Sequence, residues 1–246
     1  MNQKQQEEDK ILLAHVQDMC RRNAWRSFTN FLDMRQYCML KKYLLQGSYQ
    51  FYGGYTDSER GILCIHLQDC PPEQEEFPIT CLTIKFREAD KLTHRDILGC
   101  FMSQQIERNT IGDILVASGK IQCFVLNKIA PVILPIKKIG RVGVKITDQL
   151  SFSGDYQQQM QEITGVVSSP RLDAVLKIAL HMKRQECSRL ILAGLVMVNY
   201  QEIMKPDVLL TAGDIFSARG YGKFKLKTIS TPNQKGRLHI MIEKYL

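Results

Sequence analysis

Residues 170–199 read PRLDAVLKIALHMKRQECSRLILAGLVMVN, and this stretch decides the fold of the C-terminal third of the chain. Pro170 suits the first position of a helix, where its missing N–H costs nothing, and Ser169 can cap that helix. Gly194 can end a second helix, and the alternation of apolar residues after it predicts a short strand. The first helix has an apolar face at helical spacing, formed by Leu172, Val175, Leu176, Ala179 and Met182.

Two cations, Lys183 and Arg184, begin the second helix. The positive end of the helix dipole should repel each of them by roughly 0.3–1 kcal/mol. A helix start that carries free N–H groups and two cations is favourable when an anion such as a phosphate binds there. The stretch therefore predicts a binding site for a polyanion.

The pattern extends over fifteen positions in order: Arg171-Leu172-Asp173, Lys183-Arg184, Leu190-Ile191, Gly194, Val196, Val198-Asn199, Lys205-Pro206 and Gly213-Asp214. It resembles the RNA-binding domain first described in ribosomal protein S-four. The resemblance implies a small helix–helix–strand (αL) unit whose paired helices bind RNA backbone. Many members have Ser in place of Lys183 and Gly in place of Tyr200, and Tyr200 disfavours a simple Asn-Gly hairpin turn.

The charge of the chain is concentrated on the same third. Residues 165–246 hold 13 Lys and Arg against 6 Asp and Glu, whereas residues 1–164 hold 20 against 19. A basic domain attached to a neutral body indicates a polyanionic partner, usually nucleic acid. We therefore expect the RNA contacts to come from Arg171, Lys183, Arg184, Asn199, Lys205, Arg219, Lys223 and Lys225.

Lys223, Lys225 and Lys227 alternate with Phe224, Leu226 and Thr228, which predicts a strand with one apolar and one basic face. The basic face is either merely solvated or follows the phosphates of an RNA. The uneven charge of the chain favours the second interpretation.

The composition excludes several classes of protein. No run approaches the ~20 apolar residues that span a bilayer, and the polar start MNQKQQEEDK does not resemble a secretory signal, so we expect a cytoplasmic protein without membrane insertion. The eight cysteines form no Cys-x-x-Cys pair, which indicates reduced thiols. The five histidines have no metal-binding spacing, so we expect no metal and no cofactor. We expect a monomer.

The earlier part of the chain predicts two further regions, making the protein an α+β protein. Residues 1–76 predict an N-terminal helical region, with helices over 8–24 and 33–47 and a strand that begins at Ile62. Its second helix has a capping box, Asp33-x-x-Gln36.

Residues 77–148 predict a middle domain with the ferredoxin-like order β-α-β-β-α-β. Pro131 and Pro135 weaken its second helix, over residues 128–138. We interpret residues 149–168 as a linker and residues 169–246 as the RNA-binding domain.

The whole order resembles the YlmH family of bacterial proteins over residues 28–245. The matching motifs are Gly53-Gly54-Tyr55, Glu59-Arg60, His94-Arg95-Asp96, Leu98-Gly99, residues 111–116, residues 138–141, Arg171-Leu172-Asp173, residues 219–224 and Lys235-Gly236-Arg237. The resemblance implies binding of rRNA and tRNA on large ribosomal subunits that carry stranded peptidyl-tRNA, in rescue or quality control of stalled translation. Some members are associated with cell division.

Three motifs have alternative interpretations. His94-Arg95-Asp96 spells a kinase catalytic triplet, but the other kinase motifs are missing, so we interpret it as a helix start capped by Thr93. Asp173 lies in an Arg-Leu-Asp triplet that resembles the one in pseudouridine synthases, but the residues that follow differ. Gly220-x-Gly222 is too short for a nucleotide loop.

The sequence as a whole favours a non-catalytic RNA-binding protein. An RNA-modifying enzyme and a cell-division scaffold remain the alternatives.

Overall fold

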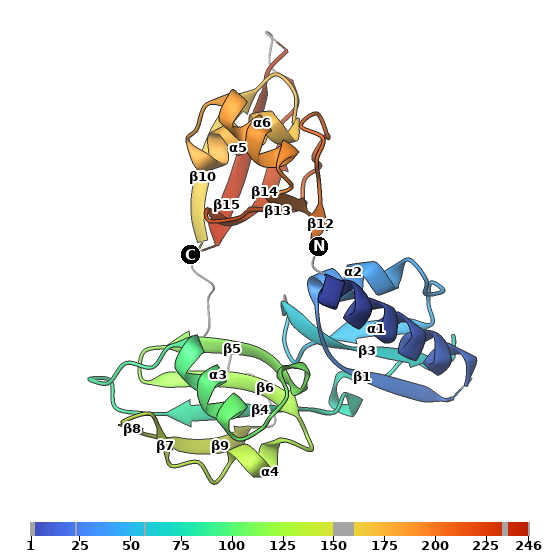
Figure 1. Cartoon of the computed structure of the whole chain (residues 1–246), viewed down its shortest axis with the longest axis vertical. Helices are drawn as coiled ribbons and strands as arrows, with labels where there is room; N and C mark the ends of the chain where they lie inside the picture. The colour runs from blue at the N-terminus through green and yellow to red at the C-terminus, as the bar shows by residue number, and fades with distance from the viewer. Residues whose placement is uncertain (1–2, 23, 57, 150–159, 233–235, 246) are drawn as a thin grey trace. The chain divides into compact units, whose positions relative to one another are not determined.

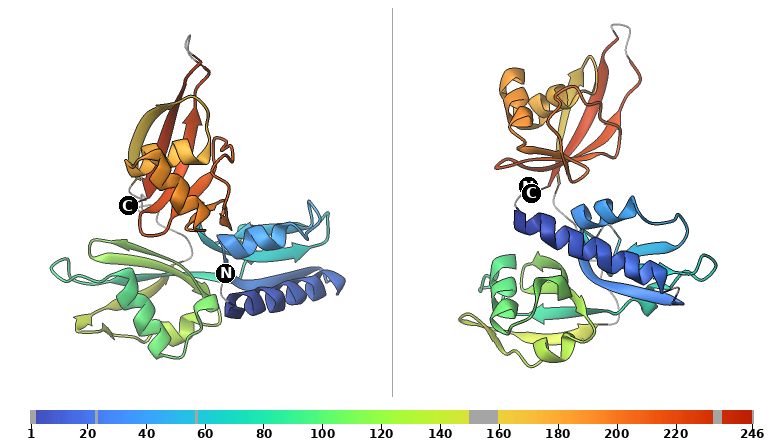
Figure 2. Two further views of the ribbon diagram at one scale, coloured as in Figure 1. Left: turned by 45° about the horizontal axis from the view of Figure 1, so that its top comes forward. Right: turned by 45° about the vertical axis from the view of Figure 1, so that its right-hand side comes forward.

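The chain divides into two compact units, Met1–Tyr156 and Gln157–Leu246, each with its own hydrophobic core (Figures 1 and 2). It is a mixed α+β protein built on antiparallel sheets, as predicted. The computed structural model describes residues 3–22, 24–56, 58–149, 160–232 and 236–245.

The N-terminal part of the first unit is a three-stranded antiparallel sheet of order β1-β3-β2 with two helices on one face. Its elements are α1 (Gln3–Arg21), β1 (Arg26–Asp33), α2 (Met34–Lys41), β2 (Tyr49–Tyr52) and β3 (Arg60–His66). The predicted capping box is confirmed, because Asp33 accepts a hydrogen bond from the Gln36 amide and Gln36 accepts one from the Asp33 amide. Helix α2 nevertheless ends at Lys41, well before residue 47.

The sequence predicted one strand in this region, and the structure has three. Strand β1 escaped detection because its register with β3 shifts between Phe28 and Phe31, which breaks the alternation of apolar residues. The Thr29 hydroxyl accepts a hydrogen bond from the Leu63 amide across this irregularity, at 3.0 Å. Strand β2 is four half-buried residues, so its burial does not alternate either.

The second part of the first unit contains a four-stranded antiparallel sheet of order β5-β6-β4-β9. Along the chain, the strands of this sheet and two helices follow one another as β-α-β-β-α-β, the predicted order. The elements are η1 (Gln74–Glu76), β4 (Ile79–Lys85), α3 (His94–Ser103), η2 (Arg108–Thr110), β5 (Ile111–Ala117), β6 (Lys120–Leu126), α4 (Ala130–Ile133), β7 (Lys138–Ile139), β8 (Val142–Gly143) and β9 (Lys145–Gln149).

The two helices of this part differ in how well the sequence predicted them. Helix α3 begins at His94, and Thr93 and Asp96 form the expected capping box. The prediction of a helix over residues 128–138 was too long, because α4 covers Ala130–Ile133 alone. Pro131 is tolerated in the first turn, whereas a longer helix would place Pro135 in its interior, where the ring clashes with the preceding turn.

A hydrophobic cluster joins the two parts of the first unit. Phe31 and Ile62 of the N-terminal sheet pack with Leu115 and Phe124 of the four-stranded sheet. The loop after β2 approaches Phe124 so closely that only glycine fits at position 54. Its φ is +102°, and an added Cβ would lie 2.3 Å from a ring carbon of Phe124.

Gly99 offers a test of helix α3 that is independent of this packing. It lies in the helix and is exposed, with no atom within 4 Å of an added Cβ. We expect Gly99→Ala to stabilise the protein by roughly 0.5–1 kcal/mol, because glycine loses more backbone entropy in a helix. Urea unfolding measures the change. Gly54→Ala should instead lower the stability, because its added Cβ would clash with Phe124. A loss of stability in Gly99→Ala would contradict the helix.

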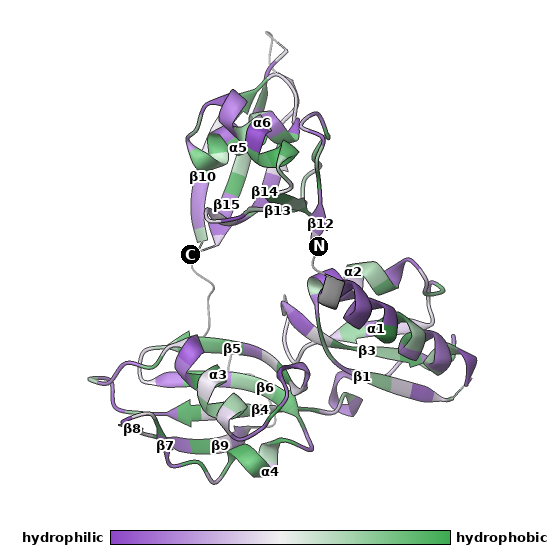
Figure 3. Cartoon of the chain, in the orientation of Figure 1, coloured by the Kyte–Doolittle hydropathy of each residue, from purple (hydrophilic) through white to green (hydrophobic). Residues whose placement is uncertain are grey.

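The second unit is a six-stranded antiparallel sheet of order β10-β15-β14-β13-β11-β12 with two helices packed on one face. Its elements are β10 (Met160–Val167), α5 (Leu172–Leu180), α6 (Arg184–Leu192), β11 (Val196–Val198), β12 (Gln201–Glu202), β13 (Ile215–Ala218), β14 (Gly222–Ile229) and β15 (Leu238–Tyr245). Hydrophobic and hydrophilic residues alternate along its strands, and the hydrophobic ones pack beneath α5 and α6 (Figure 3).

Two predictions at the start of this unit were wrong. The predicted linker over residues 149–168 contains strand β10, which pairs with β15 along its whole length, while residues 150–159 of this prediction lie outside the described ranges. The partner strand lies more than 70 residues away, so this pairing left no local signal. Ser169 does not cap the first helix, because Arg171 is its N-cap residue. The Pro170 carbonyl instead accepts a hydrogen bond from the Leu210 amide, which keeps the chain extended.

Candidate nucleic-acid interface

Helices α5 and α6 form a tight pair that brings their N-terminal ends together. His181 ends α5 in the left-handed conformation, with φ +53°, and two residues later Lys183 is the N-cap of α6. The predicted apolar face of α5 is confirmed, since Leu172, Val175, Leu176 and Ala179 are buried and Met182 is partly buried against them.

Asp173 is bound by both arginines at the helix starts. Arg184 donates to its carboxylate from Nε at 2.9 Å and from Nη2 at 3.1 Å. Arg171 donates from Nε at 3.2 Å and from Nη2 at 3.3 Å. The Asp173 side chain is 5% exposed, whereas those of Arg171 and Arg184 are 38% and 52% exposed. A buried carboxylate thus fixes two accessible guanidinium groups side by side.

The charges of this cluster are strongly coupled. Burial by itself would raise the pKa of Asp173, but hydrogen bonds from Arg184 and Arg171 outweigh it and lower the pKa below its ordinary value. The hydrogen bond to Asp173 in turn raises the pKa of Arg184. Two cations and one anion leave a net positive charge at the ends of the two helices.

Arg184 can therefore occupy the start of α6 despite the helix dipole, because Asp173 neutralises part of its charge. Lys183 is exposed, and its amide donates to the Glu186 carboxylate at 3.1 Å. Lys205 is also exposed and precedes Pro206, whose carbonyl accepts from the Asp173 amide at 3.1 Å. The backbone thus places Lys205 beside the arginine pair.

Asn199 has a structural role in this fold. Its amide group donates to Asp214 at 2.8 Å, and its side-chain oxygen accepts from the Ile215 amide at 3.1 Å. Asn199 and Tyr200 have φ values of +47° and +63° and join β11 to β12. A two-residue hairpin turn with two positive φ values therefore forms even with Tyr200 in the second position, contrary to the expectation from sequence.

The lysines of β14 lie on the sheet face opposite the helices, because the intervening Phe224 and Leu226 point into the core beneath α5 and α6. Lys223 lies over the rings of Tyr200 and Tyr245, at 5.2 and 4.7 Å from their centres. Lys225 is half-buried and paired in register with Glu243.

The basic face predicted for β14 is partly neutralised. Lys227 forms ion pairs with Glu243 at 2.7 Å and Glu162 at 3.2 Å. Its charge is therefore engaged within the sheet. The residues predicted to bind RNA therefore fall into separate groups. Arg171 and Arg184 lie at the helix starts, and Lys223 and Lys225 lie on the sheet face opposite the helices. Arg219 is exposed after β13.

The first unit contains a second cluster, formed mostly by motif residues that the sequence did not assign to a site. Asp113 is buried and accepts hydrogen bonds from the Tyr55 hydroxyl at 2.9 Å and the Glu59 amide at 2.7 Å. Burial raises its pKa. Arg60 and Arg108 lie next to it, half-buried, and both donate to the Ile111 carbonyl. Arg60 lies in one of the sequence motifs and Arg108 in none of them, and nothing along the chain indicated that the two side chains meet.

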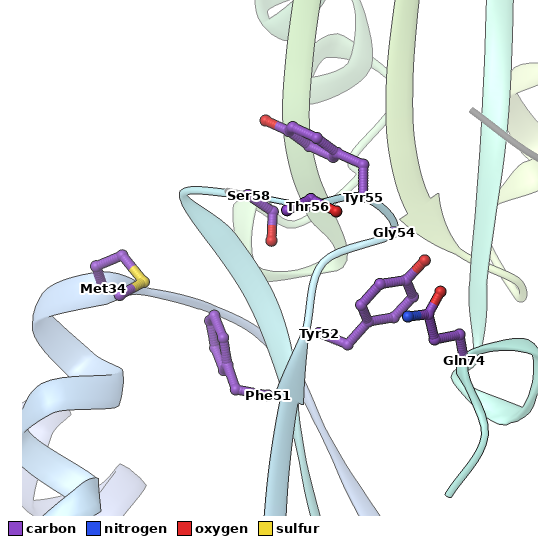
Figure 4. Close-up of a pocket in the computed structure, with 8 residues that line it drawn as sticks. All are labelled: Met34, Phe51, Tyr52, Gly54, Tyr55, Thr56, Ser58 and Gln74. Carbon is purple, nitrogen blue, oxygen red and sulfur yellow. The ribbon is translucent and has the colours of Figure 1, made fainter. Parts of the chain in front are cut away.

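A shallow pocket of about 490 Å³ opens in the first unit (Figure 4). The described residues that line it carry no acidic or basic side chain: Met34, Phe51, Tyr52, Gly54, Tyr55, Thr56, Ser58 and Gln74. Within the described ranges no three His, Cys, Asp or Glu residues are placed to hold a metal ion. No helix among the described residues is long and apolar enough to cross a membrane. The eight cysteines are free thiols.

Residues 72–152 match the model of a protein family described as "Putative RNA-binding domain in YlmH". This match identifies residues 72–152 as a domain of the YlmH family. The chain is 28% identical over 223 residues to the "Ribosome-associated protein quality control protein P2" of Bacillus subtilis (strain 168), covering 88% of this chain and 86% of that protein. A solved structure, "Cell division protein ylmH from Streptococcus pneumoniae", is 25% identical with a TM-score of 0.51, over 61% of this chain and 95% of that one.

Proposed function

We propose that this protein binds rRNA and tRNA on the large ribosomal subunit, in rescue or quality control of stalled translation. The observation that carries the proposal is the pair Arg171 and Arg184, fixed by Asp173 at the starts of two adjacent helices. Both guanidiniums bind the carboxylate through Nε and Nη2, which leaves their Nη1 edges for an RNA phosphate. The name of the Bacillus subtilis relative supports the ribosomal setting.

The proposal includes the finer description of the fold. We infer that residues 77–148 are a ferredoxin-like domain, which the sheet order β5-β6-β4-β9 supports, and that the second unit is an S-four-type RNA-binding domain with added strands. The protein is expected to act in the cytoplasm as a monomer. The family model that matches residues 72–152 supports an RNA contact from the middle domain as well.

The protein is proposed to bind RNA without changing it. Both carboxylate oxygens of Asp173 accept hydrogen bonds from arginines, its side chain is buried and its pKa is lowered, none of which suits an accessible nucleophile. Nucleoside analysis of RNA from cells with and without the protein tests this point. A modified uridine that disappears with Asp173→Asn would favour the enzyme.

The second unit alone should bind RNA. We expect a fragment of residues 157–246 to bind with a log–log salt slope of roughly −0.7 to −0.9 per phosphate contact, because each contact releases counterions. A fragment that starts at residue 168 lacks β10 and is expected to unfold more easily. Fluorescence anisotropy at several salt concentrations, with circular dichroism to verify folding, measures both effects. A flat salt response would contradict the proposed phosphate contacts.

Cosedimentation with purified large ribosomal subunits, before and after nuclease treatment, tests the setting directly. Binding that survives complete digestion of the RNA would favour a protein partner. The name of the similar Streptococcus pneumoniae protein makes a cell-division protein the candidate.

A further inference from the structure

Two arginines of the first unit converge on one oxygen atom. Arg60, at the start of β3, donates from Nε to the Ile111 carbonyl at 3.0 Å. Arg108, in η2, donates from Nη1 to the same carbonyl at 2.6 Å. Two guanidinium groups that share an acceptor lie within a few ångströms of each other, so their positive charges repel.

The carboxylates of Asp33 and Asp113 offset part of this repulsion from a distance, but among the described residues neither carboxylate accepts a hydrogen bond from these guanidiniums. The other acceptors of the two side chains are backbone carbonyls: those of Phe31 and Arg108 for Arg60, and that of Gly112 for Arg108. The nearby Asp113 carboxylate accepts instead from the Tyr55 hydroxyl and from the amides of Glu59 and Arg60. Within the described ranges, neither guanidinium forms an ion pair.

The pKa values of both guanidiniums are lowered at this site. Burial lowers the pKa of Arg60. Burial and then the charge of Arg60 lower the pKa of Arg108 to about 10. Burial and then the positive charge of Arg108 lower the pKa of His94, the first residue of α3. The charge of Arg108 therefore also acts on His94. Among the described residues, the protein thus holds two half-buried cations together without a direct ion pair to either of them.

Both arginines still have N–H groups that could bind a ligand. Arg60 uses Nε and Nη2, and Arg108 uses Nη1, in the bonds given above. Nη1 of Arg60 and both Nε and Nη2 of Arg108 donate to no described protein atom. Planar forks of this kind match the oxygens of a phosphate, whose negative charge would also reduce the repulsion between the two guanidiniums.

We propose that Arg60 and Arg108 form a phosphate-binding site in the first unit. The ligand is a phosphate group, from the RNA backbone or from a small phosphate compound. With RNA as its source, the inference deepens the proposed function, since it adds a backbone contact that is separate from Arg171 and Arg184. Carbonyl bonds from Arg60 to residues 31, 108 and 111 fix the geometry of the site before the ligand binds.

Arginine side-chain NMR on the full chain tests this site. The Nε–H signals of four arginines are assigned through single Arg→Lys variants: Arg60, Arg108, Arg171 and Arg184. They are then followed during titration with inorganic phosphate and, separately, with a short RNA hairpin. We expect the signals of Arg60 and Arg108 to shift with both ligands. Shifts with inorganic phosphate alone would support the site with a small phosphate compound as its source.

The test separates this inference from the proposed function. If Arg60 and Arg108 respond to neither ligand while Arg171 and Arg184 respond to RNA, the phosphate site is overturned and the C-terminal interface stands. If Arg171 and Arg184 do not respond to RNA but Arg60 and Arg108 bind phosphate, the site stands and the proposed function fails.

A binding measurement supplies the matched control. Arg108→Gln should weaken RNA binding about tenfold and reduce the log–log salt slope by roughly 0.7–0.9, as expected for one lost phosphate contact. Arg87→Gln removes an exposed arginine of the same unit and should leave both values unchanged. Arg108 is preferred to Arg60 because Arg60 joins three backbone segments and its loss could unfold the protein. Equal losses of RNA binding in the two variants would overturn RNA as the source of the phosphate.

Discussion

The double variant Arg171→Ala/Arg184→Ala should lose cosedimentation with the large ribosomal subunit. Each arginine presents a guanidinium edge to solvent and should contribute about 1–3 kcal/mol through charge-assisted bonds to phosphate. The two contributions are coupled through Asp173, so the double variant need not equal the sum of the single ones. Sedimentation through a sucrose cushion, at two or more salt concentrations, measures the loss.

Arg189→Ala is the matched control for this experiment. Arg189 lies on the same helix α6 and is exposed, but it does not contact Asp173. Its removal should cost distinctly less binding. If the Arg189 variant is lost from the pellet while the Arg184 variant cosediments like the wild type, the interface has been placed on the wrong residues.

The structure also changes the expected effect of these variants on stability. A cation removed from a helix start would normally relieve repulsion from the dipole. Here each single variant leaves Asp173 with the two hydrogen bonds of the other arginine, whereas the double variant leaves a buried carboxylate unpaired. Urea unfolding should accordingly show a small loss for each single variant and a larger one for the pair, and binding must be measured below the unfolding transition.

Asp173→Ala should destabilise the second unit by about 3 kcal/mol. This value is the low end of the range for breaking a buried ion pair, because the arginines are partly exposed and water screens their charges. Chemical denaturation at neutral pH measures the change. Asp207→Ala, at an exposed position nearby in the sequence, should stay within about 0.5 kcal/mol of the wild type.

The pH dependence of this effect has a defined sign. The folded-state pKa of Asp173 is lowered, so its stabilising contribution is complete above the ordinary carboxyl pKa of about 4 and is lost as the pH falls through the lower, folded value. The difference between the wild type and Asp173→Ala should therefore be largest at neutral pH and shrink in acid. A difference that is the same at both extremes would mean that Asp173 acts by packing and not by charge.

The sequence by itself determined the elements with strong local signals. The apolar face of α5, the capping boxes at Asp33 and Thr93 and the glycine stop at Gly194 depend on residues within one or two helical turns, and the structure has each of them. The family assignment also came from motifs that are readable along the chain, and the comparisons bear it out. The charge asymmetry pointed to the second unit before its fold was considered.

Only the tertiary structure decided which partners these residues have. Strand β10 resembled a linker because its partner β15 is distant in sequence, and β1 escaped detection because a register shift interrupts its alternation. Nothing near Asp173 in the sequence indicated which residues it binds; the structure buries it between Arg171 and Arg184. Arg60 and Arg108 meet at one carbonyl across 48 residues of chain. Such pairings depend on how sheets and helices pack, because folding brings together side chains whose separation along the chain carries no local signal.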